Sequence, residues 1–474
     1  MKARPLTSLA KGTNEVSIKF CGAVRTVTGS MHLLEAGGER VVIDAGLFQG
    51  HREDYYKINS QFCFDPGRID AAVISHSHID HCGNLPNLVK QGFRHKVFLT
   101  KPTRDLCRLM LLDSARIQEE DVQFVNKINA RRGLPLRQPL YTIEDANKAL
   151  KKMRSVDYYR KVKLTENIKC TFYNSGHILG STIPFFEAGN IKIAYAVDLG
   201  RNDIPLLKDP DILKGVDYLI IESTYGGRSH EPIGQAKANL AGVINETVKK
   251  GGKVIIPAFA LERTQEVVYY LCRLIKEKKI PQLPIYVDSP LACNITDIFV
   301  NSYEYFDRST KALLNNNADP FGINSIHYIR EVQESKSLNF DKRPMIIIST
   351  SGMCESGRIL HHLRNNIQDP RNTILVVGYM AKNTLGKRLV EKNKRVKIFG
   401  ESFELKAQVE VINSFSAHAD KDELVEYVLK TGSTLKKIFI VHGDMDQAEV
   451  LAQNLKSKGL RAYIPRRYET VVLD

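Results

Sequence analysis

The stretch AAVISHSHIDH, residues 71–81, joins a short apolar run to four side chains of the kind that binds metal ions. The run predicts a buried strand, and His76 and His78, two residues apart at its end, can reach one ion. Asp80 and His81 are adjacent where a helix is expected to begin, and they can face a second ion. The alternative is a hydrogen-bonded polar loop, which would be costly to bury without partners. The spacing therefore predicts a metal site.

Four more aspartate and histidine residues each follow a predicted strand. They are Asp44, His177, Asp198 and His442. Each one alone is typical of a cap or a turn, because short polar side chains bond to nearby backbone groups. Together with the 71–81 stretch they predict the remaining ligands, since loops on a rigid scaffold position functional groups.

This set of positions resembles the metallo-β-lactamase-fold hydrolases, and more specifically the beta-CASP nucleases. Asp44, the 76–81 stretch, His177 and Asp198 resemble the four metal motifs of the first group in order. Glu222, His418 and His442 resemble the three further motifs of the second group. The resemblance implies an α/β fold: a metallo-β-lactamase αββα sandwich with an inserted Rossmann-like, parallel-sheet beta-CASP domain.

The resemblance also implies two Zn²⁺ ions per chain. One ion is implied on His76, His78 and His177, and the other on Asp80, His81 and His442, with Asp198 bridging the two. Asp44 is implied to orient a ligand imidazole through its other ring nitrogen.

For catalysis, the resemblance implies that His418 protonates the leaving oxygen and that Glu222 holds its imidazole in place. Asp80 and Asp44 are also counted as catalytic residues, Asp80 as an implied metal ligand and Asp44 as the residue that orients a ligand imidazole. Two alternatives for His418 stay open, a zinc ligand and a capping residue.

The pattern of strands and helices changes twice along the chain. Residues 1–224 are rich in short strands, apart from a helical stretch within 101–163. Residues 225–400 alternate strand, turn and helix, which predicts a parallel sheet with crossover helices. Residues 401–474 return to strands. We therefore expect an inserted domain over 225–400 within a first domain made of 1–224 and 401–474.

The expected inserted domain offers a candidate phosphate site. Ser351 and Gly352 lie in a hydroxyl- and glycine-rich turn between a predicted buried strand and a helix, whose free N–H groups suit an anion. A nucleotide cofactor could use the same geometry, but the turn lacks the glycine-lysine pattern of a P-loop. Arg263 and Lys387 open similar helices, and both are equally compatible with solvated surface charges.

Composition limits the class of protein and of partner. The chain has 474 residues and a net charge of +15, which favours a polyanion such as RNA, DNA or acidic lipid, although scattered lysines also serve solubility. No apolar run approaches the roughly 18 residues of a membrane helix, so we expect no membrane partner. Eight cysteines without a C-x-x-C pair, and no secretory signal, predict a reducing cytoplasm. Tryptophan is absent, so phosphate contacts should dominate any nucleic-acid binding.

The resemblance is to the RNA-processing branch, which includes the nuclease subunit of the mRNA 3′-end cleavage complex and short bacterial and archaeal relatives. That branch carries histidine at the last motif, as His442 is here, whereas the DNA branch carries an apolar residue. The expected protein is a zinc-dependent endoribonuclease acting on single-stranded RNA. The alternatives are a 5′ exoribonuclease with the same site, a small-molecule (thio)ester hydrolase of the same fold, and a silent RNA-binding scaffold. The oligomeric state is open, with a homodimer as one alternative.

Overall fold

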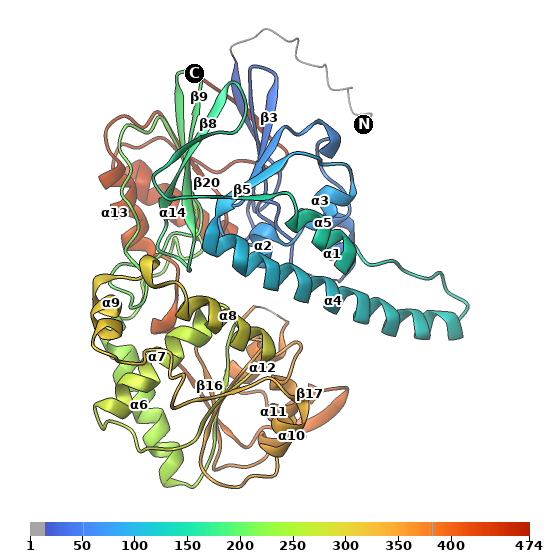
Figure 1. The fold of residues 1–474 in the computed structure, drawn as a ribbon, viewed down its shortest axis with the longest axis vertical. Helices are drawn as coiled ribbons and strands as arrows, with labels where there is room; N and C mark the ends of the chain where they lie inside the picture. The colour runs from blue at the N-terminus through green and yellow to red at the C-terminus, as the bar shows by residue number, and fades with distance from the viewer. Residues whose placement is uncertain (1–14, 51, 379, 382) are drawn as a thin grey trace. The chain divides into compact units, whose positions relative to one another are not determined.

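The computed structural model describes residues 15–50, 52–378, 380–381 and 383–474. They form two compact units (Figure 1). The first unit contains the described part of 1–202 together with 209–229 and 418–474, and the second contains 203–208 and 230–417.

Two seven-stranded sheets form the centre of the first unit. One has the order β22 (Thr470–Leu473), β1 (Val16–Phe20), β2 (His32–Ala36), β3 (Glu39–Ile43), β4 (Ala71–Val73), β5 (Lys96–Thr100) and β6 (Met153–Val156). The other has the order β21 (Ala462–Tyr463), β20 (Lys437–Ile440), β11 (Tyr218–Ile221), β10 (Ile191–Ala196), β9 (Thr182–Ala188), β8 (Ile168–Asn174) and β7 (Lys161–Lys163).

The two sheets pack face to face through side chains that alternate in direction along each strand. Val41 and Ile43 of β3 enter the cluster between the sheets, where Phe172 and Phe186 of the other sheet also lie. Val42, between them in sequence, points to the opposite face, because successive side chains of a strand alternate. Each sheet therefore has one face in the central core and one face left for helices.

Helices cover those outer faces (Figure 1). The β1–β6 sheet packs on α2 (Ile79–Cys82), α3 (Leu85–Lys90), α4 (Lys101–Arg131) and α5 (Ile143–Leu150), with α1 (Arg52–Asn59) beside them. The other sheet packs on α13 (Lys421–Thr431) and α14 (Met445–Ser457). This helix–sheet–sheet–helix order confirms the predicted αββα sandwich.

The second unit is built on a parallel sheet. Its order is β14 (His327–Ile329), β13 (Ile285–Asp288), β15 (Ile346–Ser349), β12 (Val254–Pro257), β16 (Thr373–Val376) and β19 (Gln408–Val411). All five strand pairs are parallel, which confirms the predicted Rossmann-like arrangement. The helices are α6 (Ile233–Lys249), α7 (Arg263–Lys276), α8 (Pro290–Val300), α9 (Arg308–Asn315), α10 (Val332–Ser337), α11 (Ile359–Asn366) and α12 (Leu385–Val390).

The chain leaves the second unit later than the expected boundary at 400. A hairpin of β17 (Arg395–Ile398) and β18 (Glu401–Glu404) follows α12, and β19 then pairs with β16 inside the parallel sheet. Val396, Ile398 and Val409 lie in the core of this unit. The return to the first unit therefore falls at His418.

Candidate metal centre

The 71–81 stretch folds as a strand followed by a short helix. β4 is fully buried and ends at Val73, and His76 and His78 lie in the loop that follows. His78 is the N-cap of α2, and Asp80 and His81 lie in the first turn of that helix. The local order of strand, loop and helix thus brings all four side chains together within residues 76–81.

The other candidates also follow strands of the first unit. Asp44 follows β3, His177 follows β8, Asp198 follows β10, Glu222 follows β11 and His442 follows β20. Asp44, Asp198 and His442 have φ values of +58°, +56° and +49°. Residues other than glycine rarely adopt this left-handed region, and such outliers concentrate at functional sites.

Three imidazoles converge on one side of Asp198. His78 Nδ1 lies 3.2 Å from both His76 Nε2 and His177 Nε2. Asp198 Oδ2 lies 3.2 Å from His76 Nε2 and 3.3 Å from His177 Nε2. Two nitrogens on one tetrahedral zinc ion, each about 2.0–2.1 Å from it, are roughly 3.3 Å apart. The spacing of this first cluster therefore fits a shared ion.

A second cluster lies at the other carboxylate oxygen of Asp198. His81 Nε2 is 3.0 Å from His442 Nε2 and 3.4 Å from Asp198 Oδ1, and Asp80 Oδ2 is 3.6 Å from His442 Nε2. Asp198 Oδ1 is buried and, within the described chain, has no hydrogen-bond donor. A buried carboxylate oxygen without a donor is costly, and a cation would satisfy it.

The protonation of the first cluster suits metal binding. Burial, reinforced by the charge of His81, lowers the pKa of His76 to about 4, and burial lowers the pKa of His177 well below its usual value. Burial opposes ionisation of Asp198, but the neighbouring charges of His442 and His81 hold its pKa well below the usual range. Neutral imidazoles and an ionised carboxylate are the forms that bind metals. In the second cluster burial lowers the pKa of His81, but the charges of Asp198 and Asp44 outweigh it and raise that pKa well above its usual value, so this imidazole must release a proton when a metal binds.

Asp44 supports the second cluster from behind. Its Oδ2 accepts from His81 Nδ1 (2.7 Å), Ser75 Oγ (2.8 Å) and the Tyr195 hydroxyl (3.0 Å), and its Oδ1 accepts from the Ser75 N–H (2.7 Å). The bond from Nδ1 leaves His81 Nε2 free to face the cluster. Sequence reasoning missed Tyr195, because its position on β10 is indistinguishable from that of a core aromatic.

His418 lies beside the first cluster and contacts Glu222. Its Nδ1 is 3.2 Å and 3.1 Å from the two carboxylate oxygens of Glu222, and its ring centroid is 4.5 Å from that of His177. Glu222 is fully buried and accepts from the Leu199 N–H at 2.5 Å. Burial lowers the pKa of His418, but the charges of Glu222 and Asp198 outweigh it and raise the pKa to about 9.

The candidate phosphate residues gather at the carboxyl edge of the parallel sheet in the second unit. A Cβ on Gly352 would lie 2.9 Å from the Phe259 backbone nitrogen, so the turn after β15 touches the loop that leads to Arg263. The Gly386 N–H donates to the Met353 carbonyl, which joins the same turn to α12 and Lys387. Ser351 Oγ accepts from the backbone N–H groups of Glu355 and Ser356.

The two cations differ in how available they are. Arg263 is buried and paired with Glu266, so it is not the solvated surface charge that the sequence allowed. Lys387 is half-buried and lies 3.7 Å from Glu391. Contact of either residue with a phosphate stays a prediction.

Comparison with known proteins agrees with this geometry. Residues 33–218 match the Metallo-beta-lactamase superfamily domain, residues 264–389 the Beta-Casp domain, and residues 402–465 the Zn-dependent metallo-hydrolase RNA specificity domain. Fold and site thus define a metal-dependent hydrolase of the metallo-β-lactamase class.

Similarity over whole chains narrows the class. Ribonuclease TTHA0252 of Thermus thermophilus is 33% identical over 95% of this chain and 98% of its own. The RNase J-like protein of Methanocaldococcus jannaschii is 33% identical with the same coverage, and transcription termination factor FttA of Methanosarcina mazei is 30% identical over 94% of this chain and 69% of its own. The chain belongs to the beta-CASP family of RNA-processing ribonucleases.

One solved structure shares the fold at low sequence identity. It is the crystal structure of a protein of unknown function from Enterococcus faecalis V583, with a TM-score of 0.56, 12% identity, and coverage of 97% of this chain and 100% of that one. In the part of the chain that the structure describes, no helix is long and apolar enough to cross a membrane.

Proposed function

We propose that this protein hydrolyses single-stranded RNA with two zinc ions, cutting within the strand. The observation that carries the proposal is the position of Asp198, whose two carboxylate oxygens face two different clusters of histidine and aspartate. One side chain that reaches two donor sets is the arrangement of a two-metal hydrolase.

The residues of the chain divide the work. His76, His78 and His177 would hold one ion, Asp80, His81 and His442 the other, and Asp198 both. When bound, the ions would supply positive charge that stabilises the phosphate in the transition state and lowers the pKa of the attacking water. Asp44 fixes the ring of His81. His418 would donate a proton to the leaving oxygen, with Glu222 holding its Nδ1.

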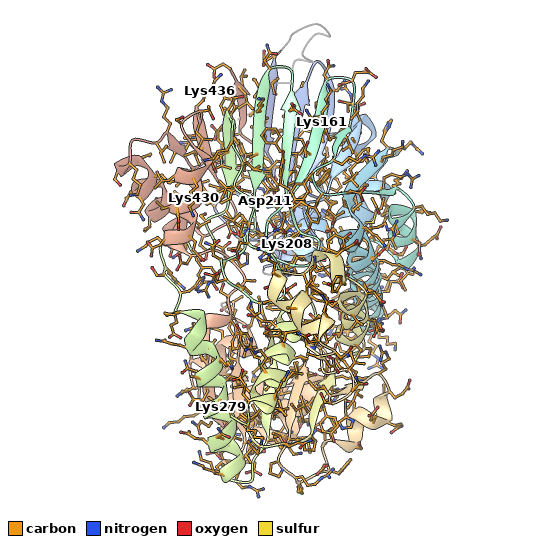
Figure 2. The ribbon with its side chains drawn as sticks, turned by 60° about the vertical axis from the view of Figure 1, so that its left-hand side comes forward. Lys161, Lys208, Asp211, Lys279, Lys430 and Lys436 are labelled. Carbon is orange, nitrogen blue, oxygen red and sulfur yellow. The ribbon has the colours of Figure 1, made fainter. Side chains whose placement is uncertain are left out.

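RNA as the substrate is supported by the family and by charge. The relatives above are named as ribonucleases and as a termination factor. His442 also resembles the histidine at the last motif of the RNA-processing branch. The net charge is +15, and Figure 2 shows Lys161 and Lys436 on the first unit and Lys279 on the second. Such a field attracts a polyanion before any specific contact forms.

A basic concavity of about 790 Å³ in the first unit is one place where a phosphate backbone can bind. Its charged lining consists of Arg94, Lys96, Lys148, Lys151, Lys152, Arg154 and Lys163, with Asp70 as the lining carboxylate. Lys148 and Lys163 pair with Glu144 and Glu166, and no ion pair between described residues neutralises the other five cations. The concavity lies at the amino ends of β4, β5 and β6, the sheet edge opposite the metal clusters.

Charge reversal in this concavity is expected to weaken RNA binding. The triple variant Lys96→Glu, Lys151→Glu, Arg154→Glu should lower affinity for a 30-nucleotide RNA and reduce the slope of log K against log salt by about 2, since each lost phosphate contact removes about 0.7. Fluorescence anisotropy over a salt series measures both quantities.

The matched control reverses three exposed lysines elsewhere, Lys276, Lys278 and Lys279, at the end of α7. This control variant has the same change of net charge, but its three positions lie outside the concavity. If both triple variants lose the same affinity and the same slope, net charge alone explains binding and the concavity has no role.

Circular substrates test the mode of cleavage and the choice of nucleic acid together. A single-stranded RNA circle has no end to load, so we expect cleavage at a rate comparable with that of the linear form. A DNA circle of the same sequence should be cut poorly. A resistant RNA circle with release of 5′ mononucleotides from linear RNA would make the protein an exonuclease, and equal cutting of the DNA circle would refute the RNA preference.

Two further predictions concern the cellular location and the oligomeric state of the protein. All eight cysteines are free thiols in the structure, which favours a reducing compartment, and we propose a cytoplasmic location on that ground. A homodimer remains a prediction. Light scattering on the purified protein measures the molar mass and so tests it.

A further inference from the structure

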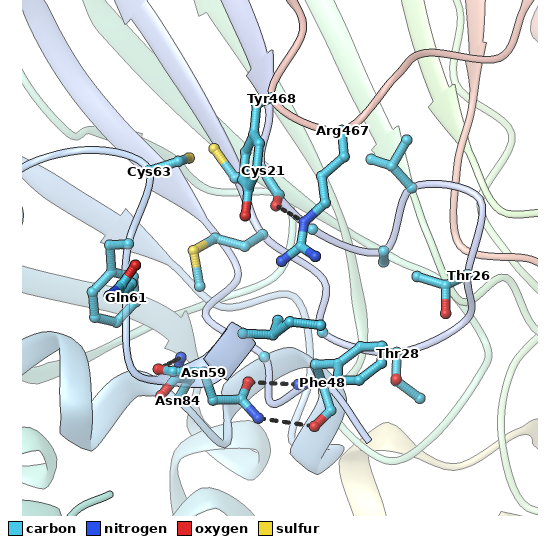
Figure 3. Close-up of a pocket in the computed structure, with 18 residues that line it drawn as sticks. Cys21, Thr26, Thr28, Phe48, Asn59, Gln61, Cys63, Asn84, Arg467 and Tyr468 are labelled. Carbon is cyan, nitrogen blue, oxygen red and sulfur yellow. Dashed lines mark hydrogen bonds between the residues drawn. The ribbon is translucent and has the colours of Figure 1, made fainter. Parts of the chain in front are cut away.

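Cys21 and Cys63 form a thiol pair that the hydrolytic site does not use. Cys21 is the residue after β1, and Cys63 lies in the loop after α1. The two sulfur atoms point toward each other in Figure 3, and each thiol changes the pKa of the other. The Cys21 thiol is also 3.6 Å from the Lys19 carbonyl oxygen. Two thiols in contact are one oxidation step away from a disulfide.

Two cations flank the pair. Lys19 Nζ donates to the Cys63 carbonyl at 2.8 Å, and Arg467 Nε donates to the Cys21 carbonyl at 3.3 Å (Figure 3). The hydrogen bond with Cys21 lowers the pKa of Cys63, and the charges of Lys19 and Arg467 add to this against burial. Burial raises the pKa of Cys21 well above its usual value. The two thiols therefore differ, because Cys63 ionises more readily than Cys21.

A small cavity is lined in part by both cysteines. Its volume is about 30 Å³, and its lining includes Cys21, Cys63, Met31, Arg467 and Tyr468 (Figure 3). Such a volume accepts a molecule of about the size of water. Cys63 is half-buried and Cys21 is buried, so a small oxidant fits where a peptide disulfide would not.

We propose that Cys21 and Cys63 are a peroxide-reactive dithiol. The Cys63 thiolate attacks one oxygen of hydrogen peroxide, the O–O bond breaks, and the departing hydroxide takes a proton to become water. Cys63 is then a sulfenic acid. The Cys21 sulfur attacks that sulfur, an S–S bond forms, the S–O bond breaks, and the hydroxyl leaves with the Cys21 proton as a second water. Two thiols lose two electrons, and one peroxide becomes two waters.

The disulfide would tether a loop that supports the metal centre. The Gly22 N–H donates to the Met31 carbonyl, and the Ala23 carbonyl accepts from the His442 backbone N–H at 2.7 Å. Cys21 is the first residue of this loop. The new bond would fix it to the loop after α1, which in the reduced protein meets Cys21 only through noncovalent contacts.

The chain contains its own control pair. Cys107 also influences the pKa of Cys82, but both residues are fully buried, and burial raises the pKa of Cys82 well above its usual value. Buried thiols in apolar surroundings are inert. Proximity alone would oxidise both pairs, whereas the proposal predicts that only Cys21 and Cys63 react.

The experiment uses the reduced, full-length protein exposed to hydrogen peroxide. Free thiols are then blocked with N-ethylmaleimide, and the chain is digested without reduction for mass spectrometry. We expect a Cys21–Cys63 linked peptide, loss of two of the eight thiols, and their return with dithiothreitol. Cys63→Ser should abolish the linkage, and Cys272→Ser, which removes a half-buried thiol elsewhere, should leave it intact.

A rate measurement on the wild-type chain does not depend on how the variants fold. At pH 7, iodoacetamide should modify Cys63 at least about tenfold faster than Cys272, whose pKa burial raises to about 12. Three results would overturn the proposal: equal rates at the two residues, sulfinic acid on Cys63 without the linkage, or a Cys82–Cys107 linkage that forms as fast.

Discussion

Asp198→Asn is expected to lose RNA cleavage and bound metal together. Asp198 Oδ2 faces His76 and His177, and Oδ1 faces His81, so an amide at this position offers only one oxygen to two clusters. Losing several kcal/mol of charge stabilisation corresponds to a rate at least about 10³-fold lower. Cleavage of end-labelled RNA gives the rate, and elemental analysis of the same preparation gives the zinc content, which should fall by at least one ion per chain.

Asp217→Asn is the matched control for this change. Asp217 is half-buried and accepts from the Lys192 N–H, but it lies at the amino end of β11, away from the clusters. It should keep its zinc and its rate. An Asp198→Asn protein with two ions and a nearly normal rate would show that this carboxylate does not bridge the clusters.

His418→Ala is expected to lower turnover while zinc content stays unchanged. A positioned general acid contributes about 10²–10⁴-fold, and the Nδ1 of His418 is already engaged by Glu222. Removing the imidazole therefore removes a proton donor and no ligand of the two clusters. Single-turnover cleavage with saturating enzyme measures the loss at the chemical step.

The control for His418→Ala is the exposed His327→Ala in the second unit, which should retain full activity. Asp198, Glu222 and His418 also lie close enough together to hold a cation themselves. Loss of one zinc ion from His418→Ala would therefore identify His418 as a ligand and not as the acid.

Glu222→Gln should give a smaller loss with a distinct pH signature. Burial lowers the pKa of His418, whereas the Glu222 charge is the largest influence that raises it, toward about 9. A neutral amide removes that support, so the imidazole loses its proton at lower pH. The alkaline limb of kcat should move to lower pH, whereas a merely structural defect would lower the rate at every pH and leave the limb in place.

Local patterns in the sequence predicted the strands and the chemically distinctive residues that follow the strand ends. The sandwich and the division of those residues into two clusters were predicted only from the resemblance to a known family. Asp44, His177, Asp198 and His442 lie far apart in the chain, yet their strands end at the same side of the two sheets. This convergence follows from the topology of a resembling family, and spacing could not provide it.

Features that depend on long-range pairing could not be predicted. The strand over 408–411 looks like those of the first domain, but its partner is β16, so the second unit extends to Ala417. Arg263 begins a helix as expected, but Glu266, one turn later, holds its guanidinium inside. The donation of Tyr195 to Asp44 joins residues 151 positions apart and leaves no trace in the local pattern.

Titration of metal-free protein with zinc tests the central claim most directly. RNA cleavage is measured on end-labelled substrate after each addition, and bound zinc is measured in the same samples. Two clusters joined by Asp198 predict that activity rises until two ions are bound per chain and then stays constant. Full activity with one ion per chain, or with none, would contradict the two-metal account.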